Sequence, residues 1–155
     1  RLDISVNILT NHAVNKNVIT VFGGNQMRPN LHVEDMVDAY QLMLTVPHEK
    51  IHGETFNIGF QNHSIAEIAR LVKKVVEEDV PEKRGIQIGT TPTNDMRSYH
   101  VNSDKAKRVL GFQPKRTVED AVRDLTRAFR NHMLPNSLDD DWYFNVRTMK
   151  KLGAK

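Results

Sequence analysis

The strongest constraint on the fold is a capped amphipathic helix in the middle of the chain. Ser64 and Glu67 have the spacing of a capping box, in which the two side chains satisfy free N–H groups of the first helical turn. Apolar residues then recur at helical spacing: Ile65, Ile68, Ala69, Val72, Val75 and Val76. The pattern predicts a helix with one apolar face that runs to about Glu78.

Further helices are predicted on both sides of this one. Residues 3–14 have a modest helical pattern, and a second helix begins at Glu34 and stops at Pro47. Val33, Met36, Val37, Tyr40 and Leu44 supply the apolar positions of that second helix. Near the end of the chain, Ser103 is expected to cap a short helix over 104–110, and Thr117 a longer one with Val118, Ala121, Val122, Leu125 and Phe129 on its apolar face. An aromatic run at 142–144 indicates a last segment that docks back on the domain.

Short extended segments alternate with these helices. Residues 18–22 and 55–58 have strand composition and are each followed by glycine, and 30–33 and 86–88 are shorter candidates. A complete doubly wound sheet needs about six strands alternating with helices. The sequence therefore predicts an α/β chain that is mostly helical, with a few short strands and no complete sheet of that kind.

The charge balance, the absence of cysteine and the length of the apolar runs argue against several classes of function. The chain has 22 basic and 19 acidic residues, a net charge of +3 with no basic block, which disfavours nucleic-acid binding. It has no cysteine, which excludes disulfides and thiolate metal sites and fits a reducing compartment such as the cytoplasm. No apolar run approaches about 18 residues, so we expect no membrane span.

Two familiar motifs need separate treatment. Residues 48–52 read H-E-x-x-H, a zinc-site pattern that works only on a helix, where both imidazoles share one face. Pro47 and Gly53 flank it and favour a loop, so we expect no metal site there. Neither G-x-G-x-x-G nor the P-loop pattern occurs anywhere in the chain, so the sequence contains no self-contained dinucleotide site.

Two polar segments contain candidate ligand-binding residues. Arg28 lies between a Gly-Gly turn and an extended segment, and a guanidinium can grip phosphate oxygens with two parallel hydrogen bonds. Asp95 and Arg97 lie in a polar stretch between a strand and a helix, where a carboxylate could accept from ribose hydroxyls and an arginine could pair with phosphate. The alternative for both is a surface or turn role.

Three segments, in order and with the right spacing, resemble one family. Residues 18–35 (VITVFGGNQMRPNLHVED) resemble the V-Y-G-x-G-x-Q-x-R-D-x-[IL]-[HY]-V-x-D segment of UDP-galactose 4-epimerases and dTDP-glucose 4,6-dehydratases. Residues 53–72 resemble their G-E-x-[FY]-N-I-G segment with its capped helix. Residues 95–114 resemble their D-x-x-x-x-x-x-D-x-S-K-A-x-x-x-L-G-[WF]-x-P segment. The likeness covers about residues 1–130 and is to the extended short-chain dehydrogenases/reductases of the NAD(P)-dependent epimerase/dehydratase type.

The resemblance implies a bipartite enzyme of which this chain is the C-terminal, nucleotide-sugar-binding half. It implies that residues 1–134 form this domain, with 55–58 joining the Rossmann sheet, and that 135–155 form a tail. The Rossmann half, with the NAD or NADP loop and the catalytic residues, is expected to precede Arg1. The intact protein is expected to be a homodimer that takes a nucleotide-diphosphate sugar.

The resemblance also assigns binding residues, and no catalytic or metal-binding ones. Arg28 corresponds to a diphosphate-binding arginine, and Asp95 lies near a ribose-contacting acid with Arg97 within reach of phosphate. Three further positions are assigned to the nucleotide pocket: Thr20 and Phe22, which pack on the base, and Asn7 on the first helix. Residues 91–93 replace the usual R-P-G, which removes a second phosphate arginine unless Arg97 takes its place.

Two functions therefore follow from the sequence. The first is the substrate-binding part of an epimerase, dehydratase or reductase that works by hydride transfer through a keto-sugar. The second is a stand-alone nucleotide-sugar-binding module without catalysis.

Overall fold

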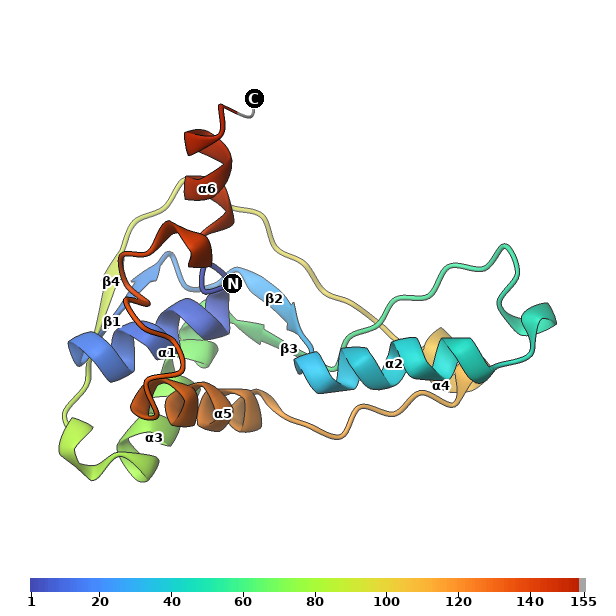
Figure 1. Ribbon diagram of the computed structural model, residues 1–155, viewed down its shortest axis with the longest axis horizontal. Helices are drawn as coiled ribbons and strands as arrows, with labels where there is room; N and C mark the ends of the chain where they lie inside the picture. Colours follow the sequence, from blue (N-terminus) through green and yellow to red (C-terminus); the bar gives the residue numbers. More distant parts are fainter. Residues whose placement is uncertain (154–155) are drawn as a thin grey trace.

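A computed structural model describes residues 1–153 of the chain (Figure 1). The helices are α1 (Ser5–Lys16), α2 (Val33–Thr45), α3 (Ile65–Asp79), α4 (Asp104–Leu110), α5 (Val118–Arg130) and α6 (Asn145–Lys151). The strands are β1 (Val18–Phe22), β2 (Met27–Asn30), β3 (Gln61–Ser64) and β4 (Gln87–Thr91). Single 3₁₀ turns are η1 (His48–Lys50), η2 (Pro81–Lys83) and η3 (Asp141–Tyr143). The predicted α/β class, mostly helical with short strands, is confirmed.

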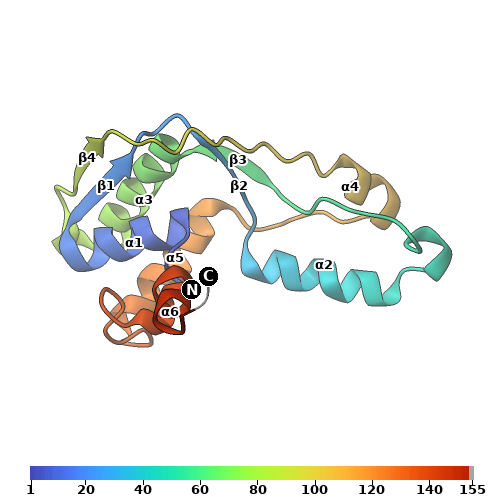
Figure 2. The same cartoon turned by 90° about the horizontal axis from the view of Figure 1, so that it is seen from above.

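The main core lies at one end of an elongated molecule, where α1, α3 and α5 pack together (Figures 1 and 2). β1 and β4 pair in parallel and place Ile19 and Val21 against these helices. The apolar face predicted for α3 is buried apart from Ile65, which is partly buried, and Val118, Val122 and Phe129 of α5 are buried as well. Burial of these side chains drives the packing, at roughly 1.5–3 kcal/mol for each large one.

A β-hairpin leads from this core to a second, smaller cluster. β2 and β3 pair antiparallel, with Arg28 opposite His63. Beyond the hairpin, α2 and α4 lie together at the far end of the molecule (Figure 2). Ala39, Ala106, Leu110 and Phe112 form the buried centre of this cluster. The molecule therefore has two apolar centres joined by extended segments.

The apolar face of α2 points away from the rest of the described chain. α2 exists as predicted, but four of the five residues that predicted it are exposed: Val33 (71%), Val37 (47%), Tyr40 (62%) and Leu44 (87%). The helix instead packs on the second cluster through Ala39, Leu42 and Met43. We call the four exposed residues the α2 stripe. No element of residues 1–153 covers it.

Two local predictions need correction, and the prediction for 55–58 stays a prediction. No described segment pairs with residues 55–58, whose expected neighbours belong to the Rossmann half, and β3 at 61–64 is the next strand along the chain, where β2 supplies a partner. The extended segment expected at 30–33 lies earlier, at 27–30, because His32 accepts a hydrogen bond from the N–H of Glu34 and caps α2. Ser103 makes no cap, because its hydroxyl bonds both to the N–H and to the carbonyl of Gly59 (2.8 and 3.0 Å).

Other end signals are confirmed. Capping boxes begin α3 and α5, and Gly111 has the left-handed conformation that ends α4 (φ 72°). The tail docks on the core as predicted, since Phe144 is buried and the N–H of Leu2 donates to the carbonyl of Tyr143 (2.7 Å). Trp142, in contrast, is 84% exposed. None of the helices in residues 1–153 has the length and apolar content needed to cross a membrane.

Candidate functional site

Gln26 joins two segments that are far apart in the sequence. Its side-chain amide donates to the carbonyls of Phe22 (3.2 Å) and Asp95 (2.9 Å), and its oxygen accepts from the N–H of Gly24 (2.7 Å). Gly23 has φ +78°, and a Cβ there would lie 2.5 Å from the Gln26 amide nitrogen. Only glycine fits this turn, and the turn fixes residues 93–99 beside β2.

Arg28 on β2 is held by the segment that Gln26 anchors. Its Nη1 donates to the carbonyls of Met27 (2.9 Å) and Arg97 (2.7 Å), and its guanidinium lies 5.5 Å from the centre of the Tyr99 ring. Its side chain is 22% exposed. Arg28 is therefore a partly buried cation in a fixed orientation, with donors left over for a ligand.

Asp95 and Arg97 form a two-point ion pair next to Arg28. The Nε and Nη2 of Arg97 donate to the two carboxylate oxygens of Asp95 at 2.7 and 2.9 Å, and the Nη2 of Arg28 lies 3.6 Å from that carboxylate. Hydrogen bonds from the Arg97 side chain and then from its backbone N–H lower the pKa of Asp95 to about 2. The same pair raises the pKa of Arg97. The three side chains carry a net charge of +1, which favours an anionic ligand.

An open pocket of about 830 Å³ lies beside this cluster. Arg28 and Arg97 line it together with Asn7, and the first turn of α1 forms another part of its wall. That turn has no capping side chain and no acidic residue, so its free N–H groups add positive potential. Arg28, Arg97 and the start of α1 thus converge on one space.

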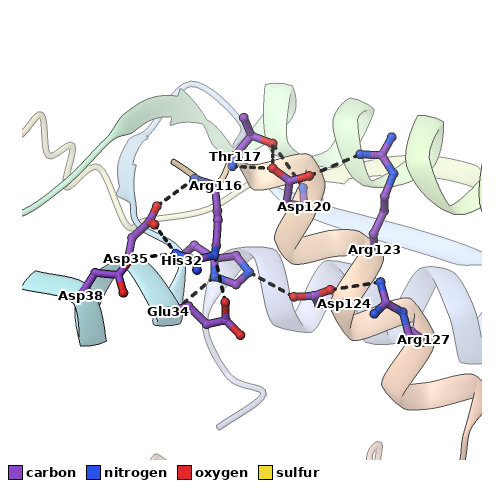
Figure 3. A network of polar contacts seen from close by, with 10 residues as sticks. All are labelled: His32, Glu34, Asp35, Asp38, Arg116, Thr117, Asp120, Arg123, Asp124 and Arg127. Carbon is purple, nitrogen blue, oxygen red and sulfur yellow. Dashed lines mark hydrogen bonds and ion pairs between the residues drawn. The ribbon is translucent and has the colours of Figure 1, made fainter. Parts of the chain in front are cut away.

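A polar network links α2 to α5 (Figure 3), and four of its residues also line the pocket: His32, Glu34, Arg116 and Asp124. Asp35, 1% exposed, accepts from the backbone N–H groups of Lys115 (3.1 Å) and Arg116 (3.0 Å) and from the Arg116 guanidinium (2.6 Å). His32 pairs with Asp124 on α5 at 3.3 Å. These contacts hold the start of α2 against α5 and the segment that precedes it.

The structure brings together most of the residues that the sequence singled out. Arg28, Asp95 and Arg97 form one cluster, and Asn7 lines the same pocket, where its amide donates to the Arg1 carbonyl (2.8 Å). Thr20 and Phe22 lie outside that pocket, on the face of β1 opposite the core, with Phe22 59% exposed. Phe22 is nevertheless bonded to Gln26, which ties it to the cluster.

The sequence reasoning missed the residues that support the site. Gln26 and Asp35 both lie in the segment 18–35 that resembles the family, at its Q and final D, but the sequence alone does not show what either side chain contacts. No sequence motif marks Tyr99 as a residue of the site. Its position beneath Arg28 depends on the pairing of its N–H with the Met27 carbonyl (3.0 Å), a contact between distant segments.

Comparison with known proteins identifies the family. The model of the GDP-mannose 4,6 dehydratase family matches residues 3–125. The chain belongs to this family. Its relatives include the dTDP-glucose 4,6-dehydratase of Shigella flexneri (30% identity over 144 residues, 88% of this chain and 37% of the relative). They also include the UDP-glucose 4-epimerase of Lactobacillus helveticus (30% over 143 residues, 86% of this chain and 42% of the relative).

Solved structures agree with the family assignment. The UDP-glucose 4-epimerase from Thermotoga maritima, determined with UDP-glucose, superposes with a TM-score of 0.67 at 25% identity, over 83% of this chain and 40% of that one. The resemblance to epimerases and dehydratases is therefore confirmed, and so is the fold. The chain spans 37% and 42% of the length of the two curated relatives above.

Proposed function

We propose that the chain holds the nucleoside diphosphate of a nucleotide sugar within an NAD(P)-dependent epimerase, dehydratase or reductase. The observation that carries the proposal is the convergence of Arg28, Arg97 and the uncapped start of α1 on one pocket. A diphosphate is a compact polyanion, and hydrogen bonds from guanidinium groups to phosphate oxygens are among the strongest in proteins. The named substrates of the relatives, dTDP-glucose and UDP-glucose, are nucleoside diphosphate sugars.

The remaining site residues extend this proposal along the ligand. Asn7 adds a polar side chain on α1 beside the arginines. Thr20 and Phe22 offer an exposed, partly apolar strand face, suited to one side of a nucleobase, and they adjoin Arg28 through the Gly23 turn. Binding energy from base and diphosphate would hold the sugar in place for a reaction elsewhere in the protein.

We propose that NAD or NADP is held by another part of the protein. The cofactor supplies hydride transfer, and this chain lacks the glycine-rich loop that binds its pyrophosphate. We therefore assign no reaction step to residues of this chain. We also propose that residues 1–134 are the nucleotide-sugar-binding domain and 135–155 a tail.

The α2 stripe supports such a division. Four large apolar side chains in a row on one helix face are costly to leave in water. We propose that the stripe and the unpaired segment 55–58 pack against the cofactor-binding half, where 55–58 adds a strand to its sheet. A homodimer and a cytoplasmic location stay predictions.

Replacement of Arg28 by alanine tests the proposed function. In the intact protein, Arg28→Ala should weaken binding of a nucleotide sugar by roughly 1.5–3 kcal/mol, which is the contribution of hydrogen bonds to a charged group. Titration calorimetry with UDP-glucose and dTDP-glucose measures it. Arg84→Ala, which removes an exposed arginine from the end of η2, is the matched control and should have no effect. Equal affinities in wild type and Arg28→Ala would refute the role.

A further inference from the structure

We propose that Asp95 is a positioning residue, which sets the orientation of Arg97 and Arg28 for the diphosphate and does not itself contact the ligand. The inference rests on the proposed function. It replaces the ribose contact that the family resemblance implies for Asp95. The geometry of the three side chains carries it.

The carboxylate of Asp95 is already occupied. One oxygen accepts from the Nε (2.7 Å) and the backbone N–H (3.2 Å) of Arg97, and the other accepts from its Nη2 (2.9 Å). The Nη2 of Arg28 lies 3.6 Å from the second oxygen. A carboxylate has about four acceptor sites, so three donors and a neighbouring cation leave little for a ribose hydroxyl.

Arg97 depends on Asp95 for its orientation. Its side chain is 72% exposed, and an exposed arginine samples many rotamers unless a partner selects one. Asp95 receives two hydrogen bonds from its guanidinium and is its main partner, while Tyr99 makes a smaller contribution that also raises the pKa of Arg97. With Nε and one side of Nη2 bound there, the free donors of Arg97 lie on the outer edge of the group. Arg97 is one of the residues that line the pocket.

Arg28 is linked to the same arrangement through the backbone. Its Nη1 donates to the carbonyl of Arg97 at 2.7 Å, while the N–H of Arg97 donates to Asp95. The contacts form a closed ring from Arg28 to Arg97 to Asp95 and back to Arg28. Removing the carboxylate opens the ring and leaves two cations side by side without a counter-charge. Loss of Asp95 should therefore weaken the grip on the diphosphate as a whole.

Asp95→Asn, tested with three ligands, separates positioning from ribose contact. The ligands are UDP, its 2′,3′-dideoxy analogue, which lacks both ribose hydroxyls, and inorganic pyrophosphate. If Asp95 positions the arginines, all three should bind roughly tenfold more weakly to Asp95→Asn, and the ratio of UDP to dideoxy-UDP affinity should stay at its wild-type value. If Asp95 binds ribose, that ratio should fall toward one and pyrophosphate affinity should not change, which would overturn the inference.

A double-mutant cycle gives a second, independent readout. Because Asp95 is proposed to act through its arginine partners, adding Asp95→Asn to Arg97→Ala should weaken UDP binding much less than Asp95→Asn alone. Fully additive effects contradict the inference. Glu82→Gln, which removes a remote exposed carboxylate that pairs with Arg130 at 3.5 Å, is the matched control. Melting curves of each variant show whether affinity is lost without loss of folding.

Failure of this inference is distinguishable from failure of the proposed function. If Arg28→Ala binds UDP as the wild type does, or the wild type binds none of the three ligands, both proposals are wrong. If Arg28→Ala weakens binding but Asp95→Asn removes only the discrimination between UDP and its dideoxy analogue, the proposed function stands and Asp95 is a ribose ligand.

Discussion

Replacing Asp35 by alanine measures how firmly the two ends of the molecule are held together. Asp35 is 1% exposed and is the hydrogen-bond acceptor for two backbone N–H groups and for Arg116 (Figure 3). Its removal leaves those N–H groups without their partner, and an unsatisfied buried group costs about 1–3 kcal/mol. Loss of one partner from a buried ion pair costs about 3–5 kcal/mol.

The structure places the expected cost at the lower end of that range. Arg116 keeps Glu34 at 2.9 Å and Asp38 at 3.1 Å, so it does not become an unpaired charge. Water also has access to the segment 115–116, which is only partly buried. We therefore expect Asp35→Ala to lower the free energy of unfolding by about 3 kcal/mol.

Urea unfolding followed by circular dichroism measures this loss. With a slope of about 2 kcal/mol/M, the midpoint should fall by about 1.5 M. Asp38→Ala is the matched control, because Asp38 shares the same Arg116 but is 38% exposed, and it should cost less than about 1 kcal/mol. A midpoint for Asp35→Ala that equals that of Asp38→Ala would refute the reasoning that burial makes the Asp35 contact the dominant one.

Three further predictions follow from local features. Hydrogen bonds from the backbone N–H and then the hydroxyl of Thr117 lower the pKa of Asp120. The ionised carboxylate therefore stabilises the folded state above the unfolded-state pKa of about 3.9. This stabilisation is lost as the pH falls through the lowered pKa of the folded state. Melting curves should therefore show Asp120→Asn less stable than wild type at pH 7, with the difference shrinking below about pH 4; a difference that grows in acid contradicts this. Gly23→Ala puts a Cβ 2.5 Å from Gln26 at a positive φ, so it should lower both melting temperature and UDP affinity, and unchanged values of both would exclude the close turn. Tyr40→Ser in the α2 stripe should lower the melting temperature of the gene-encoded protein but not that of the isolated 155-residue chain; equal effects in both would argue against docking of the stripe.

Features that depend on a few neighbouring residues could be predicted from the sequence. The capping boxes at Ser64 and Thr117 each need only two side chains three residues apart, and both helices begin where they are predicted to begin. The strand at 18–22 is recognisable from its β-branched residues and the glycines that follow. Arg28 could be singled out because the Gly-Gly turn before it fixes its surroundings.

Features that depend on distant partners could not be predicted. The spacing of apolar residues in α2 shows that a helix forms. Which face of that helix is buried depends on segments distant in the sequence, and the apolar α2 stripe is the face that is exposed. Ser103 has the composition of a cap but bonds to Gly59, 44 residues away. The ring of Arg28, Asp95 and Arg97 likewise needs the turn at Gln26 to bring positions 28 and 95 together.

The crystal structure of the gene-encoded protein with UDP or dTDP bound tests the central claim most directly. The account predicts diphosphate oxygens within about 2.7–3.2 Å of the Arg28 guanidinium, with the base on the β1 face at Thr20 and Phe22. A diphosphate bound elsewhere, with Arg28 still bonded only to the carbonyls of Met27 and Arg97, would contradict it.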